Sequence, residues 1–174
     1  MTAPRQMSRA AELVCGHLGN HGVEYELVEH RATFSAASEA EAAGVMPQMA
    51  VKTIALRDGD AYRLAVIPAS RRLDLELARE ALEASTGLRL ASESEIARDF
   101  AVFEVGALPP FGTLLPAPEV VDPRVLEQHR ILCSSGDHTH SLLIDPHDIV
   151  RLSKPRVADI CESTVWHGAP LERY

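Results

Sequence analysis

The chain has 174 residues, of which 46% are hydrophobic, and this length suits one compact domain with a real core but not two ordinary domains. It has 25 acidic and 17 basic residues and a net charge of −8, which excludes a protein that binds nucleic acid over a broad basic surface. No apolar run approaches the roughly 20 residues of a membrane span, and the first residues lack the apolar stretch of a signal peptide. We therefore expect a soluble, cytoplasmic protein without a membrane partner.

The first quarter of the chain predicts helix, strand and helix in that order. Residues 8–18 place apolar side chains three and four residues apart and are followed by Gly19, which predicts an amphipathic helix that ends there. Residues 25–29 predict a strand. Ser35 is a good helix N-cap, and Gly44 is a good left-handed terminator, so we expect a helix between them.

The next segment predicts a β-hairpin. Residues 50–57 and 61–68 are rich in β-forming side chains, and Asp58-Gly59 between them is a strong hairpin signal.

Lys52 is the most informative residue of this hairpin. The two-residue period of a strand places it on the same face as Ile54 and Leu56. A lysine on an apolar face either extends its ammonium to solvent at the end of the strand or lies in a pocket. The only other lysine in this Arg-rich chain is Lys154.

The second half alternates between helical and strand patterns. Asp74 can cap a helix to Glu83, and Ser92 and Glu95 form a capping box that opens a short helix to Asp99. Later segments follow in the order strand 101–105, turn-rich 106–112, strands 119–122, 129–134 and 142–144, helical turn 146–152, and an unpatterned tail through 166–174.

These elements predict one domain of the α/β class, in the mixed α+β form, with a mostly antiparallel mixed β-sheet surrounded by helices. Residues 1–22 form an N-terminal helix of the same domain, residues 23–152 form its body, and residues 153–174 form a C-terminal tail. Three widely spaced cysteines, Cys15, Cys133 and Cys161, form no C-x-x-C pair and predict buried thiols with no disulfide or zinc site.

Nucleotide-hydrolysing and zinc-protease motifs are absent, but three local features occur in a fixed order. The first is Val51-Lys52-Thr53 at the start of the hairpin. The second is Gly106-Ala107-Leu108-Pro109-Pro110-Phe111-Gly112, and the third is Ser134-Ser135-Gly136 before a further strand. In this order and at this separation they resemble the YbaK/prolyl-tRNA-synthetase editing-domain family, over about residues 23–152.

The resemblance implies a free-standing editing enzyme, an aminoacyl-tRNA deacylase that hydrolyses the ester of tRNA mischarged with a small amino acid, commonly on proline-specific tRNA. It implies the aminoacyl-tRNA acceptor end as partner, possibly together with an aminoacyl-tRNA synthetase, and neither cofactor nor metal. It makes Lys52 the catalytic residue, facing the glycine–proline loop and the S-x-G turn across a cleft. The substrate-binding residues that it implies are His30, Ser35, Gly106, Pro110, Phe111, Gly112, Ser134 and Gly136.

The chemistry of ester hydrolysis independently favours the same loop. Negative charge develops on the carbonyl oxygen and needs fixed donors aimed at it. In residues 106–112 the two glycines allow unusual backbone angles, while Pro109 and Pro110 stiffen the loop, so the remaining amides can point into a cleft. Lys52 suits either the developing oxyanion or the phosphate of the terminal adenosine. No nucleophile–base pair can be assembled from spacing, and we expect direct attack by water.

Two alternatives remain at this point. His138 and His140, followed by Asp145 and His147, have side chains that zinc or nickel would accept, but a solvated, polar entry to the next strand explains them more simply, and a histidine that contacts substrate is a third alternative. These histidines also depart from the family pattern after the S-x-G turn, which leaves the preferred amino acid open. A binding module that retained the pocket and lost the reaction is the other alternative.

Overall fold

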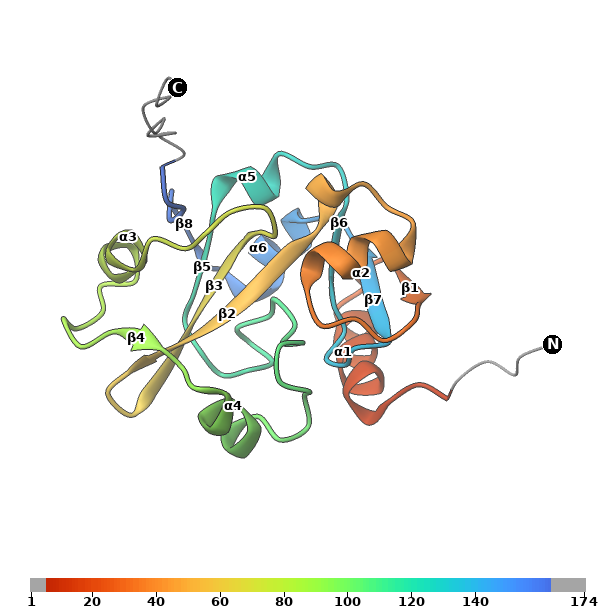
Figure 1. Cartoon of the computed structure of the whole chain (residues 1–174), viewed down its shortest axis with the longest axis horizontal. Helices are drawn as coiled ribbons and strands as arrows, with labels where there is room; N and C mark the ends of the chain where they lie inside the picture. The colour runs from red at the N-terminus through yellow and green to blue at the C-terminus, as the bar shows by residue number, and fades with distance from the viewer. Residues whose placement is uncertain (1–5, 164–174) are drawn as a thin grey trace, which may run out of the picture.

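A computed structural model describes residues 6–163, in which eight strands form two separate sheets (Figure 1). The first sheet is antiparallel, in the order β1-β7-β6, and consists of β1 (Tyr25–Glu29), β6 (Ile131–Ser134) and β7 (His140–Ile144). The second has the order β4-β2-β3-β5-β8 and consists of β2 (Val51–Asp58), β3 (Ala61–Pro68), β4 (Arg89–Leu90), β5 (Glu119–Val121) and β8 (Arg156–Val157). The predicted class is confirmed, with the strands divided between two sheets.

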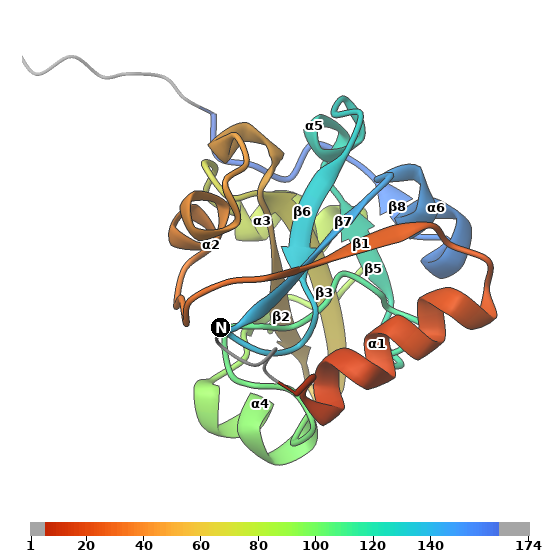
Figure 2. The same ribbon diagram turned by 90° about the vertical axis from the view of Figure 1, so that its right-hand side faces the viewer.

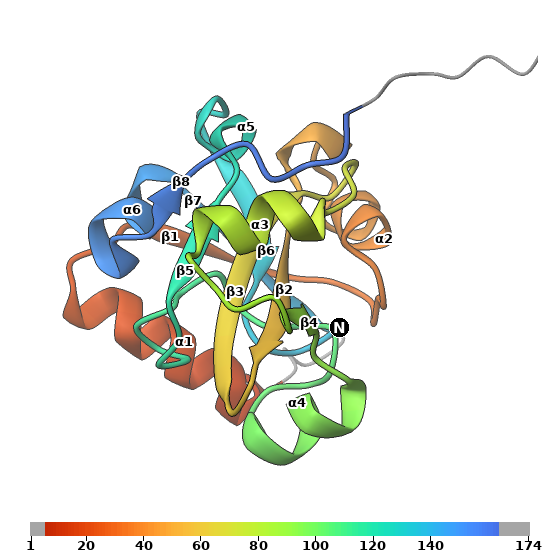
Figure 3. The same ribbon diagram turned by 90° about the vertical axis from the view of Figure 1, so that its left-hand side faces the viewer.

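The helices cover the outer faces of these sheets and close the space between them (Figures 2 and 3). Their bounds are α1 (Arg9–Asn20), α2 (Ala36–Ala43), α3 (Leu75–Ala81), α4 (Glu93–Asp99), α5 (Pro123–Leu126) and α6 (His147–Ser153), with a 3-10 turn η1 (Pro47–Met49). The predicted caps are confirmed: Ser35, Asp74 and Ser92 each accept a hydrogen bond from the first turn of their helix, and Ser8 caps α1 in the same way. None of the helices within residues 6–163 has the length and apolar character needed to cross a membrane.

Three hydrophobic clusters define the layers. The main core combines α1 with inward side chains of both sheets and of the loop before β5. Its largest fully buried side chains come from these parts, with the exception of Ile149 on α6. A second cluster lies on the other face of the larger sheet, beneath α3, and a third lies between α2 and the smaller sheet. The three cysteines are buried and unpaired, as predicted.

The alternation along β2 separates its side chains between two of these clusters. Val51 and Ala55 belong to the main core, whereas Leu56 and the half-buried Ile54 belong to the cluster beneath α3. The Lys52 side chain therefore leaves the strand on the α3 face, the same face as Ile54 and Leu56, as the two-residue period predicted.

Two sequence predictions were wrong. Residues 101–105 form turns instead of a strand, because the Phe103 amide donates to Phe100 O and the Glu104 amide donates to Gly136 O, so no strand ladder forms. The segment after α6, predicted as a C-terminal tail without a pattern, is packed on the domain as far as the structure describes it: β8 pairs with β5, and Ile160 is fully buried. Residues 166–174 lie outside the described range.

Candidate functional site

The glycine–proline loop and the S-x-G turn contact one another. The Ser134 hydroxyl donates to Ala107 O at 2.8 Å and accepts a bond from the Gly136 amide at 3.2 Å. Gly136 has a φ of 104°, and a Cβ there would lie 2.7 Å from the Phe103 ring, so only glycine fits. The turn therefore holds the loop through Ser134.

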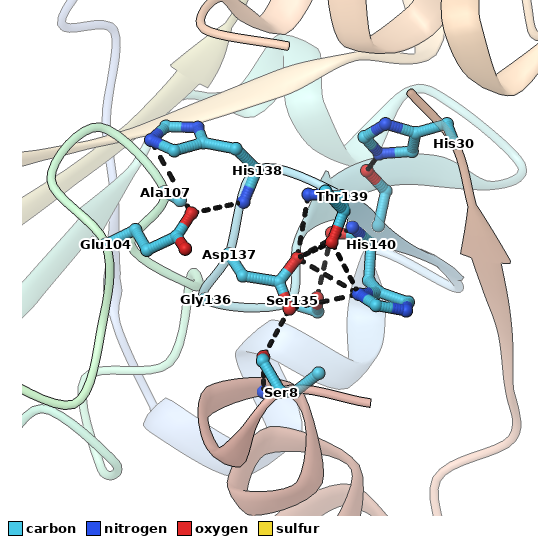
Figure 4. A network of polar contacts seen from close by, with 12 residues as sticks. Ser8, His30, Glu104, Ala107, Ser135, Gly136, Asp137, His138, Thr139 and His140 are labelled. Carbon is cyan, nitrogen blue, oxygen red and sulfur yellow. Dashed lines mark hydrogen bonds and ion pairs between the residues drawn. The ribbon is translucent and has the colours of Figure 1, made fainter. Parts of the chain in front are cut away.

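His138 fastens the start of the loop from the other side. Its Nε2 lies 2.9 Å from Val105 O, and its backbone amide donates to the Glu104 carboxylate at 2.7 Å. The ring of Phe34, which is 81% exposed, lies 4.8 Å from the His138 ring between centroids. Figure 4 shows His138 beside Glu104 and Ala107, on the loop side of the turn.

A hollow of about 240 Å³ lies between this loop and the edge of the larger sheet. Most of its lining side chains are apolar, with Thr53 and Glu93 as the polar exceptions. The lining comes from β2 (Thr53, Ile54, Ala55), from β4 and the residue after it (Leu90, Ala91), from α4 (Glu93, Ile96) and from the loop (Val105, Gly106, Leu108). Such a hollow accepts a small, largely apolar group.

The edge of β2 is open where it borders the hollow. Ala50 O accepts a hydrogen bond from Ala69 N on the β3 side, so the even-numbered residues of this segment direct their backbone groups toward β3. Ala55 O accepts from Ala91 N on the opposite side, so the odd-numbered residues of β2 direct their backbone groups away from β3. The β4 strand pairs only with Leu56 and Arg57. The N–H and C=O of Thr53 therefore face the open edge, and among residues 6–163 neither has a hydrogen-bond partner.

The loop contributes two further free donors. Within the described part of the chain, the amides of Gly106 and Leu108 donate no hydrogen bond, and both residues line the hollow. Gly106 has a φ of 85°, which places its backbone in a region that other residues rarely adopt. Fixed N–H groups without protein acceptors are what a developing oxyanion requires.

The far end of the loop is built into the core instead. Pro110 is buried, Phe111 is fully buried in the main core, and the Gly112 amide donates to Glu119 Oε2 at 2.6 Å. Burial raises the pKa of Glu119 to about 7, although the bond from Gly112 lowers it in part. Of the four loop residues predicted to bind substrate, only Gly106 lines the hollow.

Lys52 does not line the hollow, although its neighbour Thr53 does. The Lys52 side chain is half-buried, and no residue in the range 6–163 holds its ammonium by a hydrogen bond or ion pair. Burial lowers the pKa of this ammonium; Cys161 raises it, and the positive charge of Arg72 lowers it further. A half-buried cation thus lies on the α3 face of β2, outside the lining of the hollow.

His30 lies in a buried network that sequence spacing could not reveal. Its Nε2 is 2.7 Å from Ser141 Oγ, its Nδ1 is 2.8 Å from Arg31 O, and the Ser141 hydroxyl donates to Glu39. Burial raises the pKa of Glu39. The network joins β1, α2 and β7, and His30 and Ser141 are 111 positions apart in the chain. Ser35 caps α2 and lies in a shallow surface hollow beside Phe34.

The metal alternative lacks a set of ligands. His138 lies against the loop, whereas His140 Nδ1 is 3.0 Å from the buried carboxylate of Asp137, on the other side of the turn (Figure 4). His147 and Asp145 pair with one another at the surface. Across residues 6–163, no group of three or more His, Cys, Asp or Glu side chains could hold a metal ion. His138 and His140 have structural partners instead.

The structure resembles several solved proteins. A candidate trans-editing enzyme for prolyl-tRNA synthetase is 26% identical with a TM-score of 0.80, covering 91% of this chain and 100% of that one. The hypothetical protein APE2540 is 26% identical with a TM-score of 0.77, covering 86% and 99%. A candidate signal transduction protein from Marinobacter aquaeolei VT8, at 21% identity and a TM-score of 0.69, shares the fold; the match covers 92% of this chain and 33% of that longer one. No curated protein matched the chain.

At the level of sequence, the profile of the aminoacyl-tRNA editing domain matches residues 30–152, which is more than half of the chain. This range includes the hairpin with Lys52, the glycine–proline loop and the S-x-G turn. The chain belongs to the aminoacyl-tRNA editing domain family.

Proposed function

We propose that this protein is a free-standing, trans-editing aminoacyl-tRNA deacylase that hydrolyses the ester of tRNA charged with the wrong small amino acid, with proline-specific tRNA as the first candidate. The observation that supports this most directly is the hollow between Thr53 and Gly106, where free backbone donors border a small apolar space. A relative of similar size is described as a candidate trans-editing enzyme for prolyl-tRNA synthetase. In this proposal the reaction takes place in the cytoplasm, and the partner of the protein is the acceptor end of the tRNA.

In the proposed mechanism the ester carbonyl enters the hollow with its oxygen toward the free amides of Gly106 and Leu108. Water attacks the carbonyl carbon, and the negative charge that develops on the oxygen is stabilised by these donors. The bond between the carbonyl carbon and the ribose oxygen then breaks, which releases the free amino acid and the 3′ end of the tRNA. No protein nucleophile takes part.

Lys52 has a binding role in this proposal. Its side chain leaves β2 on the α3 face and is not part of the lining of the hollow, so a phosphate of the acceptor end is a better match for its ammonium than the oxyanion inside. A single half-buried cation also suits a protein of net charge −8, because the acceptor end needs local positive charge and not a basic surface.

Deacylation assays over tRNAs misacylated with Cys, Ala, Ser and Thr test the reaction. In single-turnover kinetics, we expect Lys52→Ala to raise the enzyme concentration needed for half-maximal rate by about ten- to a hundredfold, as for the loss of one charge-assisted contact. If the ammonium instead serves the oxyanion, the saturating rate falls by about a hundred- to a thousandfold.

Lys154→Ala, at the other lysine of the chain, is the matched control because Lys154 is exposed and lies at the end of α6. Wild-type protein that cleaves none of the four substrates would remove the deacylase proposal in favour of a binding module. Unchanged kinetics in a folded Lys52→Ala protein would remove Lys52 from the site.

A further inference from the structure

Glu93 is the one carboxylate among the residues that line the hollow, and its exposed side chain has no charged partner within residues 6–163. It is the first residue of α4 and borders the hollow together with Thr53 and Gly106. In the part of the chain that the structure describes, no hydrogen bond or ion pair engages its side chain. A free carboxylate beside an otherwise apolar surface is the complement of a small ligand with one positive charge.

The neighbouring acidic residue differs from Glu93 in this respect. Glu95 accepts two bonds from Arg89 and one from the Ser92 amide, and these contacts hold its pKa well below the usual range. Glu95 therefore serves the capping box and the attachment of α4 to β4. Glu93 also lies in the first turn of α4, where a negative charge is favourable, but its carboxylate makes none of these contacts within residues 6–163.

The proposed substrate has the matching charge. An aminoacyl ester has an α-ammonium group two bonds from the carbonyl carbon, and its side chain branches from the same α-carbon. With the carbonyl oxygen at the loop amides, the ammonium and the side chain must both lie inside the hollow or at its rim. The free C=O of Thr53 offers a second acceptor for an N–H donor on this side.

We propose that Glu93 binds the α-ammonium group of the aminoacyl ester, so that the hollow selects a free amino acid on the tRNA over an acyl group without the positive charge. The inference rests on the proposed function for the identity of the ligand. Glu93 positions the ester through its charge, while the apolar wall formed by residues such as Leu108 and Ile96 receives a small side chain. An N-acylated or α-hydroxy ester would leave the Glu93 carboxylate without a partner.

The test uses two stable compounds, 3′-alanylamino-3′-deoxyadenosine and its lactyl counterpart, in which a hydroxyl replaces the ammonium. Binding of each is measured by calorimetry or NMR titration to the wild type, Glu93→Gln and Glu80→Gln. Glu80 is the matched control because it is exposed on α3, away from the hollow, and its substitution removes the same charge.

We expect the wild type and Glu80→Gln to bind the ammonium compound about tenfold tighter than the lactyl compound, and Glu93→Gln to bind the two equally. Retained preference in Glu93→Gln, or no binding of either compound to the wild type, overturns the proposal. Thermal melts that match the wild type confirm that Glu93→Gln is folded, and Glu93→Asp should restore part of the preference.

Deacylation of alanyl-tRNA and lactyl-tRNA, measured in parallel, separates this inference from the proposed function. A wild type that binds the ammonium compound selectively but cleaves neither tRNA contradicts the deacylase proposal and leaves the Glu93 site standing. A wild type that cleaves both tRNAs at equal rates, with Glu93→Gln unchanged, supports the deacylase and contradicts the Glu93 site.

Discussion

The two ends of the loop from Gly106 to Gly112 have the same residue type and opposite environments. Gly106 is exposed at the hollow and has a positive φ, and its amide donates no hydrogen bond to any of residues 6–163. Gly112 is buried, and its amide is bound to Glu119. A Cβ at Gly106 would meet only His138 at 3.6 Å, whereas a Cβ at Gly112 would lie 2.4 Å from Ala117 O. Gly106 is needed for the positive φ beside the hollow, whereas Gly112 is needed because there is no space for a side chain behind the loop.

The largest effect that follows from this comparison is a loss of stability in Gly112→Ala. Its Cβ overlaps backbone and displaces the amide from Glu119, so overpacking and a buried carboxylate without its donor act together. We expect the free energy of unfolding to fall by about 4 kcal/mol. Denaturant titration measures this directly, and a loss below about 1 kcal/mol would show that the far end of the loop is not fixed by packing.

A second effect concerns Glu119 and pH. Its pKa is raised from 4.5 to about 7, so the stability associated with the protonated form is fully present below pH 4.5 and is lost as pH rises through about 7. The loss is on the order of 3 kcal/mol. Glu119→Gln stays neutral and retains an oxygen for the Gly112 amide, so its stability should fall less than that of wild type between pH 4.5 and 8.

Unfolding free energies of both proteins at several pH values across this range provide the check. The difference between the two curves isolates Glu119 from the histidines, which titrate in both proteins. If the unfolding free energies of the two proteins change in parallel between pH 4.5 and 8, the pKa of Glu119 is not raised in the folded protein.

The smallest effect on stability, and the most selective effect on activity, is expected for Gly106→Ala. Alanine costs about 1 kcal/mol at a positive φ, and there is space for its Cβ. Movement of the free amide should lower the single-turnover rate by about tenfold or more, since one donor to an oxyanion contributes this much. A folded Gly106→Ala protein with the wild-type rate would exclude the near end of the loop from the reaction.

The sequence predicted most elements because their signals are local. Ser35 and Gly44 define the ends of α2 by their own hydrogen bonds and backbone angle, and Asp58-Gly59 defines the hairpin turn. The strand predicted at residues 101–105 failed because a strand requires a partner, and the partners of this segment are Phe100 and Gly136, of which the second is distant in sequence.

The ordered motifs by themselves determined the family and the loop, since each motif consists of neighbouring residues with restricted backbone choices, whereas the contact of the loop with the S-x-G turn joins distant segments. Tertiary structure alone decided which motif residues face the hollow. It placed Phe111 in the core and Lys52 outside the lining of the hollow, and it left Thr53 and Glu93 with groups that have no partner among residues 6–163, beside Gly106. The physical reason is that a free hydrogen-bonding group is defined by the absence of partners, and partners such as Glu119 for Gly112 or Ser141 for His30 are determined only when distant segments pack together.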